Sequence, residues 1–152
     1  MNEQLKNILP DNRIEELLSI GREKSIVSSD YFIRAGETPI KIAYVFKGLF
    51  RYVYFNDNGD EFTKAILSED NFISSYSAMV LSKPSYFSIE ALENSHLLEI
   101  TWSDFNQLKE NDVFWVKFLI GAVAVWWQGW SDLAGNKAKH DLFFCLFYVA
   151  HT

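Results

Sequence analysis

The sequence predicts a mainly β fold, an antiparallel barrel or sandwich with helices flanking it. Short runs of β-type residues between residues 26 and 101 alternate apolar and polar side chains. Turn-forming residues interrupt these runs about every eight to twelve residues, as in small all-β domains. The chain has 152 residues, of which 49% are hydrophobic and 16% aromatic, so it can form one domain with a real core.

Composition narrows the classes of function. The formal net charge is −6 and Lys and Arg do not cluster, which is a poor basis for binding nucleic acid. Cys145 is the only cysteine, which excludes an intrachain disulfide and a cysteine-based metal cage. The N-terminus has no apolar signal core, and the apolar run 113–127 is too short to cross a bilayer. We therefore expect a soluble, cytoplasmic protein that does not enter a membrane.

The first element is a helix predicted over residues 3–20. Asn12 and Glu15 have the spacing of a capping box, and Gly21 is the expected C-cap. This helix carries no chemistry and is expected to pack on the domain.

Four β-type runs follow, and Asn58-Gly59 between the last two is a strong hairpin signal, because a tight turn demands residues with positive φ. Two more strands are expected at residues 86–92 and 95–101. The four runs are Tyr31–Ile33, Ile42–Phe46, Leu49–Phe55 and Glu61–Leu67.

The stretch Asn71–Leu92 is the only one that resembles a site more than a scaffold. Its first three residues close a strand, and Ser74–Leu81 has the length of one or two helical turns with Ser74 or Ser75 as N-cap. Residues 82–85 form a turn. Serines and aromatic residues are concentrated here, which makes the segment a candidate ligand site.

The C-terminal part predicts helices. A helix begins near Trp102 with Ser103 as its N-cap, and residues 113–130 are apolar nearly all round. A helix of that kind must be buried, and a subunit interface is the natural use. Gly121 and Gly129 each weaken the helix by about 1 kcal/mol relative to alanine. The residues expected at a dimer interface are Phe114, Trp115, Phe118 and Leu119.

Over residues 30–108 the chain resembles the sensor domain of Crp/Fnr-type transcription regulators, the catabolite activator family. The resemblance implies a jelly-roll-like antiparallel β-roll at 1–110 with a helical cassette, and a dimerisation helix at 111–130. Residues 131–152 form an atypical tail in place of the DNA-binding domain usual in the family. The matching segments are Ile33–Glu37, Ile42–Gly48, Asn58–Glu61, Asn71–Ile73, Ile89–Leu92 and Leu98–Ile100.

The cassette differs from that of relatives that bind cyclic nucleotides. Where they carry the glycine and glutamate of a Phe-Gly-Glu motif, this chain has Ser74 and Ser75. Their arginine falls on Ser85, and the small residues after it fall on Tyr86 and Phe87. Each charge-assisted hydrogen bond lost is worth roughly 1.5–3 kcal/mol. We therefore expect an effector other than cAMP or cGMP.

Three interpretations of the cassette remain open. It is a vestigial pocket filled by its own aromatic residues, a pocket adapted to another small molecule, or a contact surface for a protein. In the second case three aromatic side chains form a cage, serines donate hydrogen bonds and Lys64 supplies a cation. The candidate ligand-binding residues are Ser74, Ser75, Tyr76, Ser85, Tyr86, Phe87 and Lys64.

No pattern of residues predicts catalysis or a metal centre. His96, His140 and His151 lack the spacing of metal ligands, and Glu90 and Glu93 have no nucleophile or paired partner. The lone cysteine excludes an iron–sulfur cluster. We expect a protein that is not an enzyme and holds no cofactor or metal.

The resemblance implies the ligand-sensing domain of a transcriptional regulator, a homodimer that responds to an unknown small-molecule effector. DNA binding is expected to be lost or supplied by a missing C-terminal region. The alternative is a stand-alone small-molecule-binding or protein-interaction module without DNA output. One hypothesis is that the tail Gly121–Thr152 is the product of a frameshift or a truncated gene. The rival hypothesis is a genuine short protein whose apolar tail is buried in a dimer.

Overall fold

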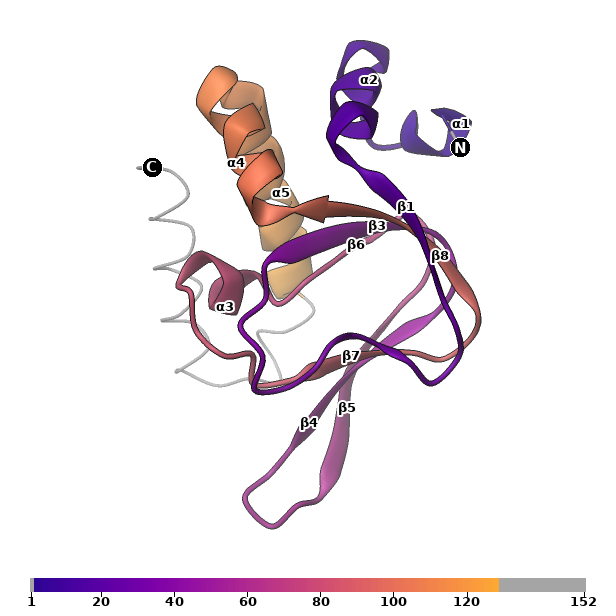
Figure 1. The fold of residues 1–152 in the computed structure, drawn as a ribbon, viewed down its shortest axis with the longest axis vertical. Helices are drawn as coiled ribbons and strands as arrows, with labels where there is room; N and C mark the ends of the chain where they lie inside the picture. Colours follow the sequence, from indigo (N-terminus) through magenta and orange to yellow (C-terminus); the bar gives the residue numbers. More distant parts are fainter. Residues whose placement is uncertain (1, 129–152) are drawn as a thin grey trace.

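The fold is an antiparallel β-roll of two four-stranded sheets with helices packed at one end (Figure 1). The structure, a computed structural model, describes residues 2–128, with side chains from residue 3 to residue 122. The predicted fold class is confirmed. The first sheet has the order β1 (Arg22–Ile26), β8 (Ser95–Thr101), β3 (Lys41–Lys47), β6 (Phe72–Ile73); the second has β2 (Tyr31–Ile33), β7 (Ser88–Ala91), β4 (Phe50–Phe55), β5 (Glu61–Leu67).

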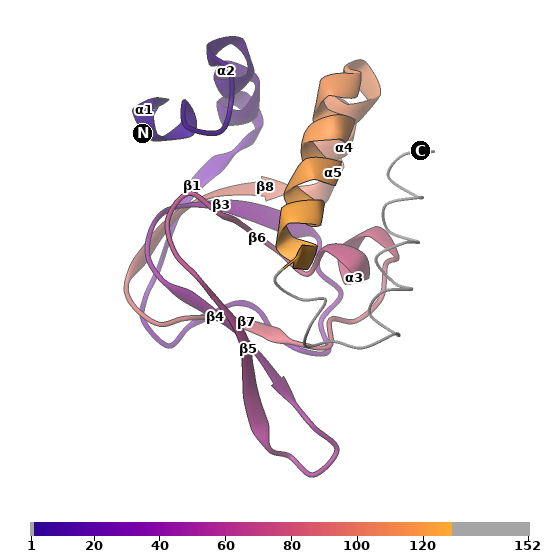
Figure 2. The same cartoon turned by 180° about the vertical axis from the view of Figure 1, so that it is seen from behind.

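Among residues 2–128, four of the helices gather at one end of the roll, and the β4–β5 hairpin projects from the opposite end (Figure 1). The remaining described helix, the short α3, lies between β6 and β7 near the lower end of α5 (Figure 2). The helices are α1 (Asn2–Leu5), α2 (Asp11–Ile20), α3 (Tyr76–Val80), α4 (Trp102–Asn111) and α5 (Val113–Gln128).

The predicted helix over residues 3–20 is wrong as a single helix, because it is broken into α1 and α2. Pro10 stands at the N-cap of α2 with an extended backbone, φ −61° and ψ 149°. Proline disfavours helical geometry in the residue before it and is itself well placed at a helix start. Asn12 therefore lies inside α2, and no side chain caps this helix. The predicted capping box does not form.

Gly21 ends α2 as expected, but for a different reason. Its N–H donates to the carbonyl of Leu17 at 3.0 Å, and its φ of −85° is open to any residue. A Cβ at this position would lie 2.6 Å from Leu98 Cδ1. A side chain here would displace that of Leu98 on β8, so close packing favours glycine at this position and a left-handed turn does not.

The predicted strands form, with small shifts at their ends. The expected strand at 86–92 shortens to Ser88–Ala91. The β4–β5 hairpin turns at Asn58-Gly59, where Gly59 alone takes a positive φ of 83°. The side chain of Asn56 shapes this turn by accepting from the N–H groups of Asn58 at 3.0 Å and Asp60 at 2.9 Å.

The β3 strand separates two apolar clusters and is buried on both faces. Ile42 and Tyr44 point into the first cluster, between the first sheet and the helices, whereas Ala43 and Val45 point into the second, between the two sheets. This explains why the run reads as continuously apolar and not as alternating.

The C-terminal helices meet at an elbow. Thr101, not the predicted Ser103, caps α4, because its Oγ1 accepts from the N–H of Asp104 at 3.1 Å. Asp112 is extended, with φ −151° and ψ 126°, and separates α4 from α5. The dimer helix was predicted over residues 111–130, and within the described residues it corresponds to α5. Residues 129–130 and the predicted tail at 131–152 lie outside the described part of the chain.

Candidate functional site

The cassette is built around α3, which the chain reaches directly from β6. Its inner side packs Tyr76, Met79 and Val80 into the first apolar cluster. Ser82 ends it in the left-handed region, with φ 52°, and Lys83 N–H donates to the carbonyl of Ala78 at 2.8 Å. The helix forms where predicted. Its N-cap is Ser75, but the Ser75 side chain makes no capping hydrogen bond.

The predicted serines are buried and hydrogen-bonded within the chain. Ser74, Ser75 and Ser85 are 0%, 1% and 3% exposed. Ser74 Oγ donates to the carbonyl of Lys41 at 2.8 Å. Ser85 Oγ lies 2.9 Å from Ser75 Oγ and donates to the carbonyl of Phe87 at 2.7 Å. The structure thus brings Ser75 and Ser85 together, ten residues apart in sequence, as a contact pair inside the cassette.

The β2–β3 loop holds the far end of the cassette. Gly36 N–H donates to the carbonyl of Ser85 and Ser85 N–H donates to the carbonyl of Glu37, both at 2.8 Å. Ala35 N–H donates to Ser88 Oγ at 2.9 Å. Ser85 therefore has its backbone and its side chain engaged, and it closes the cassette against a loop whose position here was not predicted.

The three aromatic residues predicted as a cage differ in burial. Tyr76 is 7% exposed, Phe87 is half-buried with its ring centroid 5.1 Å from that of Tyr52, and Tyr86 is 71% exposed. Tyr76 and Phe87 thus belong to the wall of the cassette, whereas most of the Tyr86 ring faces outward.

Tyr52 on β4 belongs to this wall, although sequence reasoning missed it. Burial raises the pKa of Tyr52 well above its ordinary value, with a smaller contribution from nearby Tyr76, and a backbone hydrogen bond from Ser74 acts in the opposite direction. The signal that could have found it is the alternation along β4, which places Phe50 and Tyr52 on the same face as each other.

Lys64 lies on β5, half-buried, with Nζ 5.0 Å from the ring centroid of Tyr54. Burial lowers the pKa of its ammonium, so the charged form is less favoured here than in water. Stacking of Tyr54 on Phe62, with centroids 5.3 Å apart, extends this surface along the hairpin. The lysine is therefore on an aromatic strand surface, as a cation–π partner.

The described residues hold neither a metal cluster nor a membrane span. Between residues 2 and 128, no three His, Cys, Asp or Glu side chains are placed to bind one metal ion. Within the same range, no helix has the length and hydrophobicity to cross a bilayer. Cys145, His140 and His151 lie outside the described residues.

The model of the family described as "Cyclic nucleotide-binding domain" matches residues 23–112. The chain belongs to this family. A search of curated proteins found no match.

Solved structures of low sequence identity share the fold of this cyclic nucleotide-binding domain. A cyclic nucleotide-binding domain from Methylobacillus flagellatus has a TM-score of 0.75 and 14% identity over 87% of this chain and 82% of that chain. The catabolite activator protein of Thermus thermophilus has a TM-score of 0.71 and 18% identity, over 86% of this chain and 60% of that chain. A c-di-GMP responsive global regulator of Xanthomonas campestris has a TM-score of 0.68 and 16% identity, over 78% of this chain and 58% of that chain. The chain thus spans about 60% of these two regulators.

The predicted dimer residues of this domain lie on α5, where two of them pack inside their own chain. Trp115 is 0% and Leu119 2% exposed in the first apolar cluster, so neither side chain has surface left for a second subunit with α5 in this position. Phe114 and Phe118 are partly buried against the same cluster. Dimerisation itself stays a prediction.

Proposed function

We propose that this cyclic nucleotide-binding domain is the ligand-sensing domain of a Crp/Fnr-type transcriptional regulator and that its effector is not cAMP. The role is binding in the cytoplasm, not catalysis, with the β-roll as sensor and α5 as the output helix. The observation that carries the proposal is the buried Ser75–Ser85 pair. It occupies the two positions at which the resemblance places the glutamate and the arginine of cyclic-nucleotide binders.

The chemistry of this pair disfavours a phosphate. A cyclic phosphate keeps its charge at neutral pH, so its transfer into the cassette requires a charged or strongly polar partner. Neutral hydroxyl donors contribute roughly 0.5–1.5 kcal/mol each, against roughly 1.5–3 kcal/mol for a bond to a charged group. Ser75 and Ser85 are in addition already bonded to each other, and binding would have to break that contact.

The wall of the cassette favours a neutral or weakly charged aromatic molecule. Tyr76, Phe87 and Tyr52 supply ring surface, and buried hydroxyls supply a few polar groups, which is the usual make-up of a small-molecule site. The Xanthomonas protein of similar fold is described as c-di-GMP responsive, so proteins of this fold include one that responds to an effector other than cAMP. That effector carries two phosphates, and it therefore supports a change of effector and not a neutral one. No DNA contact is assigned to residues 2–128.

The output follows from shared packing. Tyr76, Met79 and Val80 of α3 lie in the same apolar cluster as Trp115 and Leu119 of α5. A ligand that shifts α3 therefore changes the packing of α5, because close-packed side chains cannot move independently. We propose that α5 then changes its position in a homodimer.

A thermal-shift screen tests the proposal, with cAMP, cGMP, c-di-GMP, guanosine and adenosine as probes. A ligand at one hundred times its Kd stabilises the folded state by about 2.7 kcal/mol, which is a clear shift in Tm. We expect no shift with cAMP or cGMP. A shift with cAMP at micromolar concentration would overturn the assignment of the effector.

The matched variant is Ser75→Leu, which replaces the hydroxyl beside Ser85 with a larger apolar side chain and adds no charge. A probe that binds in the cassette should lose its shift in this variant and keep it in Ser68→Ala, an exposed serine before the β5–β6 turn. A shift that survives Ser75→Leu would place the ligand elsewhere and contradict the proposed site.

A further inference from the structure

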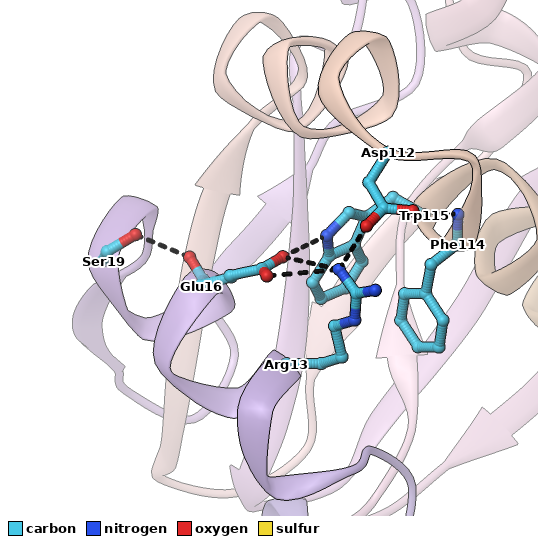
Figure 3. Close-up of polar contacts among 6 residues, drawn as sticks. All are labelled: Arg13, Glu16, Ser19, Asp112, Phe114 and Trp115. Carbon is cyan, nitrogen blue, oxygen red and sulfur yellow. Dashed lines mark hydrogen bonds and ion pairs between the residues drawn. The ribbon is translucent and has the colours of Figure 1, made fainter.

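A polar junction joins α2 to the elbow between α4 and α5 (Figure 3). Arg13 Nη1 lies 2.7 Å from Asp112 Oδ2 and 3.2 Å from Glu16 Oε1. Trp115 Nε1 donates to Glu16 Oε2 at 2.7 Å. The guanidinium also lies 4.5 Å from the ring centroid of Phe114. We call these five residues the Arg13 junction.

Asp112 has two tasks in the Arg13 junction. Its Oδ1 accepts from the N–H of Phe114 at 2.9 Å, which satisfies a free N–H group in the first turn of α5. Its Oδ2 holds Arg13 of α2. Both contacts, and the nearby positive charge of Arg13, lower the pKa of Asp112. The residue that directly precedes α5 is therefore bonded to a different helix.

Trp115 connects the junction to the core. Its ring is fully buried, with T-shaped contacts to Phe105 at 5.9 Å and Phe118 at 5.6 Å between centroids. A buried indole N–H needs an acceptor, and Glu16 supplies it. The side chains of Glu16 and Asp112 are 39% and 37% exposed, so water can replace these polar contacts if the elbow opens.

The same indole ring lies in the apolar cluster that contains the inner face of α3. Any rotation of α5 about Asp112 must withdraw Trp115 from this cluster and break its bond to Glu16. We propose that the Arg13 junction is a clasp that holds the elbow closed on α2, and that effector binding acts on α5 by working against this clasp. The inference rests on the proposed function, because it names the regulated step.

The fraction of molecules with an open elbow determines how the clasp changes the affinity for the effector. If the effector favours the open elbow, its apparent affinity is reduced by the fraction of molecules that are open. A weakened clasp raises that fraction and therefore tightens effector binding without any change in the cassette. Weaker effector binding in the same variant would mean that the effector favours the closed elbow, and it would overturn the proposed role of the clasp. Tighter binding requires coupling between the junction and the cassette, which lie on different elements.

Hydrogen exchange of the Trp115 indole N–H, followed by NMR in the full chain, tests the clasp without any ligand. The resonance is assigned by its loss in Trp115→Phe. In Arg13→Gln, which removes both ion pairs and keeps the Glu16 acceptor, we expect exchange to be about three- to tenfold faster. The matched control is Arg51→Gln, which removes an arginine bound to Glu61 and Glu90 on the second sheet. The control should leave the rate unchanged.

Amide exchange in β3 separates a clasp from a general loss of stability. We expect the amides of Tyr44 and Val45 to keep their rates in Arg13→Gln, since the elbow opens without unfolding the roll. An unchanged Trp115 rate, or equal acceleration in β3, would overturn the clasp.

The two proposals fail separately. A thermal-shift ligand found with an unchanged Trp115 rate leaves the effector site standing and refutes only the clasp. Faster Trp115 exchange with no ligand from the screen leaves the clasp standing and counts against the effector. For any probe that does bind, Arg13→Gln should lower its Kd by a comparable factor, and an unchanged or raised Kd would remove the regulatory role.

Discussion

Gly48 lies at a position of the roll where the backbone conformation and a close neighbour both disfavour a side chain. It connects β3 to β4 with φ 136°, and a Cβ there would overlap the side chain of Ser95 and lie 3.0 Å from its Cα. Gly48→Ala should therefore lower the free energy of unfolding by at least about 2 kcal/mol, from strain and from the clash. Urea denaturation followed by circular dichroism measures the loss.

Gly59→Ala is the control for backbone strain alone. Gly59 has a positive φ of 83° in the β4–β5 turn, but no atom lies within 4 Å of the added Cβ. Its cost should stay near 1 kcal/mol, the usual penalty for a left-handed residue with a side chain. Equal losses in the two variants would mean that the contact with Ser95 relaxes at no cost.

The raised pKa values of two buried tyrosines lead us to expect that the stability of the fold depends on pH. Burial raises the pKa of Tyr44, helped by its hydrogen bond to Asp70 at 2.7 Å, and burial raises the pKa of Tyr52. In the unfolded chain both phenols titrate near pH 10. Between that pH and their folded pKa values the folded state binds more protons than the unfolded state, so stability falls as pH rises.

The free energy of unfolding should thus be constant with respect to these groups below about pH 9 and decrease above about pH 10. Urea titrations at a series of pH values measure it, and Tyr44→Phe should flatten the alkaline limb. Phenolate absorbance gives the counter-test. If all tyrosines of the native protein ionise together near pH 10, the burial argument for Tyr44 and Tyr52 is wrong.

At the same scale, the sequence predicted the location of the cassette but not the state of its side chains. Ser75 and Ser85 were identified from their order in the chain and from the resemblance. That their hydroxyls meet at 2.9 Å depends on the loop at 35–37, which holds Ser85 in place from a distant part of the chain. Contacts of this range leave no periodic signal in a sequence.

Among the elements, those with a strong local signal were predicted and those set by tertiary contacts were not. The β4–β5 hairpin carries Asn-Gly and was found. The β1 strand was missed because residues 22–25 are all exposed and show no alternation. The boundary between the two C-terminal helices was predicted at residue 111, close to the break at Asp112. Asp112 caps α5 locally, because its Oδ1 accepts from the N–H of Phe114, whereas its contact with Arg13, about a hundred residues earlier, leaves no signal in the sequence.

The attachment of α5 to the roll makes a prediction at this scale. Leu119 is 2% exposed in the first apolar cluster, and truncation to alanine leaves a cavity that close packing cannot fill. Leu119→Ala should cost about 2–5 kcal/mol of unfolding free energy, measured in urea. Val113→Ala is the control, because Val113 is 62% exposed at the start of the same helix. Its effect should lie within about 0.5 kcal/mol.

A small loss in Leu119→Ala would contradict the position of α5. The helix would then make its apolar contacts with something other than the first cluster, and the clasp at Arg13 would have nothing to hold in place. The two measurements therefore check each other, since both depend on Trp115 and Leu119 packing against the side of the roll that also carries α3.

At the scale of the whole molecule, the described side chains of α5 are buried on one side only, and several of the others are partly exposed. Trp115 and Leu119 use the side that faces the first cluster. The sequence of the helix, VFWVKFLIGAVAVWWQ, is apolar nearly all round, and a helix of that kind must be covered on its other sides as well. A second copy of the chain is the occupant we expect, with Phe114 and Phe118 at the contact.

One chain has a mass of 17.6 kDa. Sedimentation velocity at micromolar concentration should give twice that mass. Phe118→Lys should shift this mass toward one chain, because Phe118 is only partly buried and a charge at the contact of two apolar helices is costly to desolvate. Phe55→Lys is the control, since Phe55 is 57% exposed at the tip of β4, away from α5. A monomer in the unmodified chain would leave α5 as an output helix within one subunit, and the coupling through Trp115 would then have to act on a different partner.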